Sequence, residues 1–175
     1  KFLFSARKRV WRGQKTTEGG FRTIQEAAVQ SQRFAFIGVR ACELNAIHIQ
    51  DQVFMNRQHQ DTEYKNKRAD NFIVAVNCGQ AGKTCFCTSL NTGPKVSEGY
   101  DLVLTEIIDD DIHYFVVESG SERGSDVLND LPSQSVSNSD LAAVEKCTEK
   151  AIRQMGRAID TKDIKAFLYR NYDNK

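Results

Sequence analysis

Two short apolar runs, separated by a helical pattern, constrain the fold of this chain more than any other feature. The runs are FAFIGV, residues 34–39, and FIVAV, residues 72–76, and both are rich in aromatic and β-branched residues. That composition predicts two buried strands. Between them, the segment ACELNAIHIQDQVFM spaces its apolar residues as a helix does, and a polar linker follows it. A strand–helix–strand crossover makes the two strands parallel, so both should end at the same edge of a sheet.

The rest of the chain predicts a hairpin followed by helices. The segments DLVLTEI and IHYFVVES flank an acidic turn and predict the two hairpin strands. Capping signals then predict helices that start near Ser121, at Asn138-Ser139-Asp140 and at Thr161, the second with an apolar side that includes Leu141 and Ile152. The first twenty residues predict an edge strand or an irregular arm.

These patterns predict an α/β fold with a small mixed sheet. The sheet holds a parallel βαβ unit and a hairpin, helices pack around it, and the C-terminal third is helical. A chain of 175 residues can form one core of ordinary size, so we expect a single domain over residues 1–175. Residues 138–170 are expected to be a helical C-terminal extension of it.

The charge balance argues against two classes of partner. Lys and Arg together number 24 and Asp and Glu number 23, so no field of one sign would attract nucleic acid or an anionic membrane. No apolar run approaches 18 residues, and the start of the chain lacks the apolar stretch of a secretory signal. We therefore expect a cytoplasmic protein with reduced thiols.

Four of the five cysteines are predicted to meet at one place. Cys42 follows the first apolar run by three residues and opens the predicted helix, where the helix dipole favours a thiolate. Cys78 directly follows the second strand segment, and the carboxyl ends of parallel strands are where ligands bind in open α/β sheets. Cys85 and Cys87 lie on a loop that contains Gly79 and Gly82 and can fold back over the same edge.

Four thiolates suit either a cubane iron–sulfur cluster or a structural zinc ion. Zinc fits less well, because zinc ligands come in closely spaced pairs, whereas 35 residues separate Cys42 from Cys78. The alternative is that these cysteines are small core residues, since free cysteine is among the most buried residue types. Cys147 lies on a later helical stretch and is assigned no role.

Other patterns near these cysteines are less informative. GQAGKT resembles a phosphate-binding loop, but the first glycine of that motif should stand where Asn77 does, so the match fails. Arg40 and Glu43 flank Cys42 and could tune a metal site or form an ion pair that holds the loop. Residues around Gly120, including Arg123, could bind an anion or simply cap a helix.

Several segments together resemble one known family. In order, FIGVRACELNAIHIQDQVF, FIVAVNCGQAGKTCFCTSLNTGP, YDLVLTEI, VESGSERG and AIRQMGRAIDTKDIKAFLYRN resemble the amino-terminal region of the family of sulfhydrogenase beta subunits and anaerobic sulfite reductase A subunits. Members are iron–sulfur electron-transfer subunits of cytoplasmic redox complexes in anaerobic metabolism. The resemblance implies that Cys42, Cys78, Cys85 and Cys87 bind one [4Fe–4S] cluster, and the pattern "RAC…VNC…TCFC" is its most specific part.

The resemblance also implies a non-catalytic role and a set of partners. The domain would pass single electrons between a flavin or NAD(P)H subunit on one side and a hydrogenase or sulfite reductase subunit on the other, and none of its residues would be catalytic. The family continues into a ferredoxin-like dicluster region, so we expect this chain to be excised from a longer protein. Two alternatives stay open: a metal-free or zinc-bound docking scaffold for a ferredoxin-like module, and a flavin- or nucleotide-binding domain.

Overall fold

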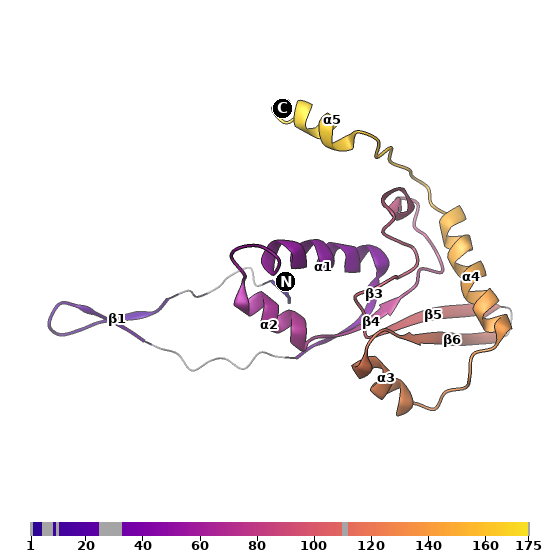
Figure 1. Cartoon of the computed structure of the whole chain (residues 1–175), viewed down its shortest axis with the longest axis horizontal. Coiled ribbons are helices and arrows are strands. Elements are labelled where there is room, and N and C mark those ends of the chain that lie inside the picture. Colours follow the sequence, from indigo (N-terminus) through magenta and orange to yellow (C-terminus); the bar gives the residue numbers. More distant parts are fainter. Residues whose placement is uncertain (1, 5–8, 10, 25–32, 110–111, 175) are drawn as a thin grey trace. The chain divides into compact units, whose positions relative to one another are not determined.

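A computed structural model describes residues 2–4, 9, 11–24, 33–109 and 112–174 (Figure 1). The described elements, in chain order, are β1 Gly13–Lys15, β2 Phe21–Thr23, β3 Ala35–Arg40, α1 Ala41–Phe54, α2 Thr62–Asp70, β4 Phe72–Val76, the 3-10 helix η1 Cys87–Leu90, β5 Leu102–Asp109, β6 Ile112–Ser119, α3 Glu122–Asn129, α4 Asn138–Arg153 and α5 Ile164–Arg170. The chain divides into two compact units, one of residues 1–34 and 51–71 and the other of residues 35–50 and 72–175. A single domain over residues 1–175 and a C-terminal extension over residues 138–170 stay predictions.

The larger unit contains a four-stranded mixed sheet in the order β3-β4-β5-β6. Strands β3, β4 and β5 run parallel, and β6 pairs with β5 as an antiparallel hairpin. The predicted α/β class, with its parallel βαβ unit and hairpin, is therefore confirmed. Residues 110–111, part of the predicted acidic turn, lie outside the described residues.

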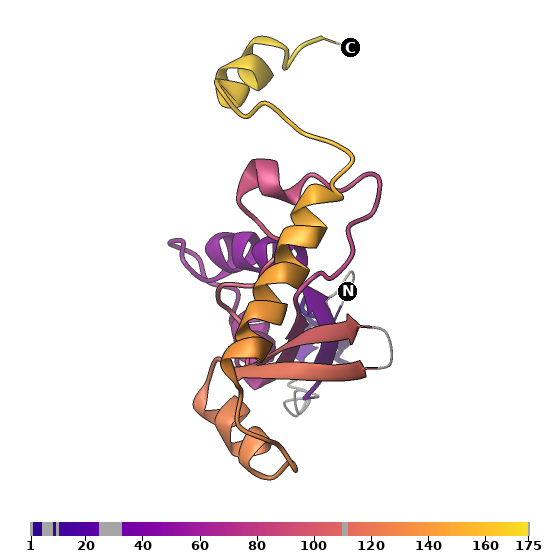
Figure 2. The same cartoon turned by 90° about the vertical axis from the view of Figure 1, so that its right-hand side faces the viewer.

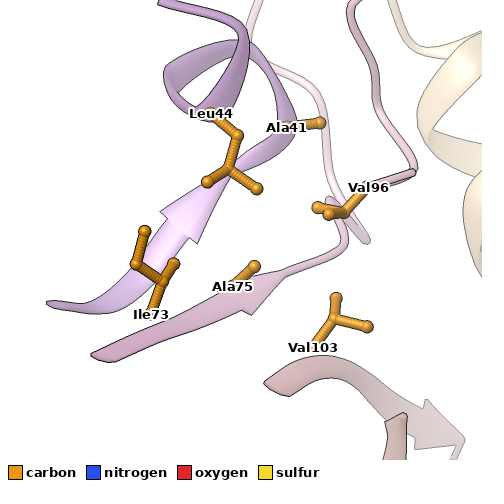
Figure 3. Packing of buried hydrophobic residues seen from close by; sticks show 6 residues of the cluster. All are labelled: Ala41, Leu44, Ile73, Ala75, Val96 and Val103. Carbon is orange, nitrogen blue, oxygen red and sulfur yellow. The ribbon is translucent and has the colours of Figure 1, made fainter. Parts of the chain in front are cut away.

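The main core forms where α1 packs on the centre of the sheet. Strand β4 alternates half-buried and buried positions, so Ile73 and Ala75 share one face. Figure 3 shows Leu44 of α1 pointing toward this strand, and Ala41 belongs to the same buried cluster. Val96 and Val103 complete the buried cluster. Burial of these apolar side chains stabilises the packing of α1 against β4.

A second cluster lies under α4, which crosses the β5–β6 hairpin (Figure 2). Ile107, Val116 and Val144 are its buried members, and Cys147 packs against them half-buried. The predicted apolar side of this helix is wrong at two positions, because Leu141 and Ile152 are 54% and 46% exposed. Val144 and Ala151 on the same predicted side are buried, so the covered side of α4 is narrower than its apolar periodicity predicts.

The prediction of a buried strand at residues 34–39 is also wrong. In the part of the chain that the structure describes, β3 has β4 as its only neighbour and forms an edge of the sheet. Ile37 is 77% exposed, and the register shifts between Ile37 and Val39, around Gly38 with its φ of +84°. A bulge of this kind breaks the regular edge that a further strand would need for pairing.

The smaller unit differs from the sequence prediction in two ways. The predicted polar linker contains α2, which Asp61 caps by accepting a hydrogen bond from the Tyr64 backbone N–H at 3.0 Å. Tyr64 is buried and its hydroxyl donates to Asp51 Oδ1 at 2.7 Å, while Arg68 Nε lies 3.1 Å from Asp51 Oδ2. Because α2 buries a single aromatic side chain, its sequence has too little apolar periodicity to predict a helix. The predicted edge strand or irregular arm is the β1–β2 hairpin, which forms a sheet of its own.

The starts of α3 and α4 follow the predicted capping chemistry, whereas α5 begins at Ile164, later than the predicted Thr161, and its cap residue Asp163 makes no side-chain capping hydrogen bond. Ser121 caps α3 by accepting from the Gly124 N–H at 3.0 Å. Ser137, one residue before the predicted cap, forms a capping box with Asp140 at the start of α4. No helix among the described residues is long and apolar enough to cross a membrane.

Candidate functional site

Cys42 and Cys78 follow the carboxyl ends of two neighbouring parallel strands, at the same edge of the sheet. Arg40 and Val76, the last residues of β3 and β4, are register partners. Each cysteine lies two residues beyond its strand, Cys42 in the first turn of α1 and Cys78 at the start of a long loop. The level ends of the two strands are a direct consequence of the parallel pairing.

Buried hydrogen bonds close the loop that carries the other two cysteines. Asn77, which is buried, donates from Nδ2 to Thr105 Oγ1 at 2.8 Å and accepts at Oδ1 from the Val96 N–H at 2.7 Å. The Cys78 N–H donates to the Pro94 carbonyl at 3.2 Å. The loop therefore leaves the sheet and returns to it at nearly the same point.

The returning loop places Cys87 beside the first turn of α1. A Cβ atom on Gly93 would lie 3.1 Å from the Cβ of Ala41 and 3.2 Å from the Sγ of Cys87. Any side chain at Gly93 would push these segments apart. Gly82 lies next to Cys85 in the same way, since its Cβ would stand 3.5 Å from the Cys85 Sγ.

The four predicted cysteines are electrostatic neighbours. Burial raises the pKa of Cys87, and the charges of Cys42, Cys78 and Cys85 raise it further. Burial also raises the pKa of Cys78; Arg40 opposes this, and the charges of Cys42 and Cys85 add to it. The charges of the neighbouring cysteines thus disfavour the thiolate forms of Cys78 and Cys87, and a bound cation would oppose that effect.

Two donors point at sulfur atoms of this group. The Gly82 N–H donates to the Cys85 Sγ at 3.3 Å, and Arg40 Nη1 lies 3.9 Å from the Cys78 Sγ. The charge of Arg40 opposes the effect of burial on the pKa of Cys78 and so favours its thiolate form. The Arg40 backbone N–H in turn donates to Glu43 Oε2 at 2.8 Å, so the predicted charged pair beside Cys42 is a hydrogen bond that stabilises the start of α1.

Among the described residues, the four cysteines are not grouped as the ligands of a single metal ion would be. Within residues 33–109 and 112–174 and the shorter described stretches, no three Cys, His, Asp or Glu side chains are arranged to hold one metal ion. A cubane cluster binds each thiolate to a different iron atom, so its ligands stand farther apart than those of a single zinc ion. Binding of a cluster by these four cysteines therefore stays a prediction.

A clamp formed by Gln154, Met155 and Gly156 holds the cysteine loop, and no sequence pattern indicates it. Gln154 Oε1 accepts from the Ala81 N–H at 3.2 Å. Met155 Sδ lies 3.8 Å from the Cys87 Sγ. A Cβ atom on Gly156 would overlap the Lys83 carbonyl. The sequence predicts Met155 on the apolar side of its helix and Gly156 as a helix break, and neither prediction connects these residues with the cysteines.

Cys147 and the residues near Gly120 have structural roles. Cys147 lies against Gly79 and donates to the Glu106 carbonyl at 3.7 Å. Its pKa is raised by burial, and the charges that act on it are Lys150 and Glu106 rather than the other cysteines. The predicted anion site near Gly120 is a cap in which Arg123 pairs with Asp101 at 3.1 Å.

Comparison with protein-family models, curated proteins and solved structures finds no match for this chain. The resemblance to the family of sulfhydrogenase beta subunits and anaerobic sulfite reductase A subunits therefore stays a prediction from the quoted segments.

Proposed function

We propose that this chain is an electron-transfer domain that holds one [4Fe–4S] cluster through Cys42, Cys78, Cys85 and Cys87. Geometry carries the proposal: Cys42 and Cys78 lie two residues beyond strand ends that are register partners, and the loop of Cys85 and Cys87 returns against Ala41 in the first turn of α1. When bound, a cluster of this type accepts and donates one electron at a time.

The surrounding residues would tune such a site. Arg40 and the Gly82 N–H place positive charge and a hydrogen-bond donor at sulfur, and both raise the reduction potential of a thiolate-bound cluster. Met155 covers Cys87 and limits its contact with water. The domain's own contribution is therefore to stabilise thiolates and to shield them.

We propose a place for the domain in a cytoplasmic redox complex of the hydrogenase or sulfite reductase type. Its partners would be a flavin or NAD(P)H subunit together with the subunit that carries the terminal centre. This part of the proposal rests on the resemblance of the quoted segments.

The test is anaerobic purification followed by iron, acid-labile sulfide and zinc analysis. We expect about four iron and four sulfide per chain, and an electron paramagnetic resonance signal after reduction. Replacement of any one of Cys42, Cys78, Cys85 and Cys87 by serine should lower the iron content strongly. Cys147→Ser is the matched control and should leave it unchanged.

Other results would support different functions. One zinc per chain without sulfide would favour the docking scaffold, and a bound yellow chromophore would favour a flavin domain. Iron content that stays the same in Cys85→Ser would exclude Cys85 as a ligand and overturn the proposal.

A further inference from the structure

A second feature of the sheet edge is an open pocket of about 520 Å³. Arg40 and Cys78 form the wall next to the thiol site, Glu106 lies on β5, and Lys146 and Lys150 project from α4. The volume falls within the range of about 300–1,000 Å³ that is usual for small-molecule sites.

The pocket lies where open α/β sheets bind ligands. Its walls come from the carboxyl ends of all three parallel strands, at Arg40, at Val76 and at residues 106–109. Strand β5 extends beyond β4, because Val76 pairs with Leu104 while β5 continues to Asp109. This overhang lines the pocket together with residues of α4, which packs on it. The crevice beyond the carboxyl ends of parallel strands is the general binding position in such sheets.

The charges that line the pocket favour an anion. Arg40, Lys146 and Lys150 face Glu106 and Asp109, so the positive charges are in excess. Glu106 already has a partner in His113, whose Nε2 lies 2.9 Å from its Oε1. Arg40, Lys146 and Lys150 form no ion pair with another described residue. Lys146 and Lys150 are therefore available to a ligand, and Arg40 lines the same pocket with its Nη1 3.9 Å from the Cys78 Sγ.

We propose that this pocket binds the phosphate group of a small molecule. Three cations, one from β3 and two from α4, suit a dianion, and an arginine guanidinium matches the oxygens of a phosphate. A lone phosphate would fill only part of the volume, which leaves room for an organic body. The inference goes beyond electron transfer and does not depend on a bound cluster.

The test is a nuclear magnetic resonance titration of the ¹⁵N-labelled full chain at constant ionic strength. The two probes are inorganic phosphate and glycerol 3-phosphate. We expect saturable shifts of the amide signals of Gly79 and Gln80 and of residues 146–150. The double variant Lys146→Gln/Lys150→Gln should bind at least about tenfold more weakly, which corresponds to about 1.4 kcal/mol or more.

The control is Lys162→Gln/Lys165→Gln, which removes two exposed lysines away from the pocket and should leave binding unchanged. Saturation by both probes would assign the site to the phosphate group itself, and tighter binding of glycerol 3-phosphate would show that the organic body contributes. Shifts that do not saturate with either probe, or equal binding by the Lys146→Gln/Lys150→Gln variant, would overturn the inference. Iron and sulfide content of that variant should match the unaltered chain, so a failure here is separable from a failure of the cluster proposal.

Discussion

The Sδ atom of Met155 lies 3.8 Å from the Sγ atom of Cys87, although the two residues are 68 positions apart in sequence. The same methionine sulfur lies 3.5 Å from the Thr88 hydroxyl. The end of α4 therefore covers one of the four candidate ligands, and this contact suggests a direct test of how the thiol is shielded.

Met155→Ala should lower the pKa of Cys87, because burial is the largest cause of its elevation. In metal-free protein, alkylation of Cys87 by iodoacetamide at neutral pH should become about three- to tenfold faster. Mass spectrometry of the labelled peptides measures the rate. Ile152→Ala, a truncation at an exposed position of the same helix, is the control. Equal rates in the two variants would argue against shielding by Met155.

Gly156→Ala should displace the cysteine loop. The added methyl group would overlap the Lys83 carbonyl, which is backbone and cannot rotate away. We expect a loss of about 1–3 kcal/mol in the free energy of unfolding, measured with urea, and a lower iron content after anaerobic purification. Gly20→Ala adds the same group 3.4 Å from the Thr16 hydroxyl and should cost less. An unaltered iron content in Gly156→Ala would contradict the clamp.

Arg40→Gln should raise the pKa of Cys78 further, because the guanidinium 3.9 Å from its sulfur lowers that pKa. In metal-free protein, Cys78 should then be alkylated more slowly at a given pH. In protein that contains the cluster, removal of the positive charge should make the reduction potential more negative, as measured by a spectroscopic redox titration. Arg153→Gln, which removes an exposed arginine paired with Glu149, should change neither quantity.

Asp140 should make the stability of α4 depend on pH. Hydrogen bonds from the Ser137 side chain, from its backbone and from the Tyr114 hydroxyl lower the pKa of this carboxyl group. A lowered pKa in the folded state means that the stabilisation is complete above the unfolded pKa of about 3.9 and is lost as the pH falls through the folded value.

Asp140→Asn should therefore lower the melting temperature at pH 7, and the difference from the unaltered chain should shrink below about pH 4. Thermal unfolding followed by circular dichroism over this pH range measures the effect. Asp173→Asn is the control, since Asp173 is exposed and near the end of the described chain. A difference that stays constant with pH would show that the Asp140 charge is not responsible.

Asp101 should contribute more to the free energy of unfolding than its ion-pair partner, Arg123. Its buried carboxylate accepts from the Ile73 N–H at 2.8 Å and from the Ser121 hydroxyl at 2.6 Å, and it pairs with Arg123, which is 53% exposed. Asp101→Ala leaves the buried Ile73 N–H without its acceptor, which costs about 1–3 kcal/mol. Arg123→Ala removes only a half-exposed charge and should cost less than about 1 kcal/mol. Urea unfolding of both variants compares the two losses, and equal losses would be inconsistent with this account.

Local sequence patterns were sufficient for the central fold. The apolar runs that became β3 and β4, and the periodic segment that became α1, depend on residues that are close in the chain. Because parallel strands must end at one edge, the same patterns placed Cys42 and Cys78 there. The caps at Ser121 and Ser137 are also local, since each hydroxyl meets a backbone N–H three residues ahead.

Contacts between distant segments were decided only by the tertiary structure. The sequence contains no signal that α4 ends over the loop of Cys85 and Cys87, because that position depends on how α4 packs on the β5–β6 hairpin. The exposed edge of β3 and the pocket beside Arg40 also depend on how distant segments pack. The number of neighbours that a strand or helix acquires is a property of the whole packed chain. Short-range periodicity determines which face of an element is apolar, whereas the folded arrangement determines what covers that face.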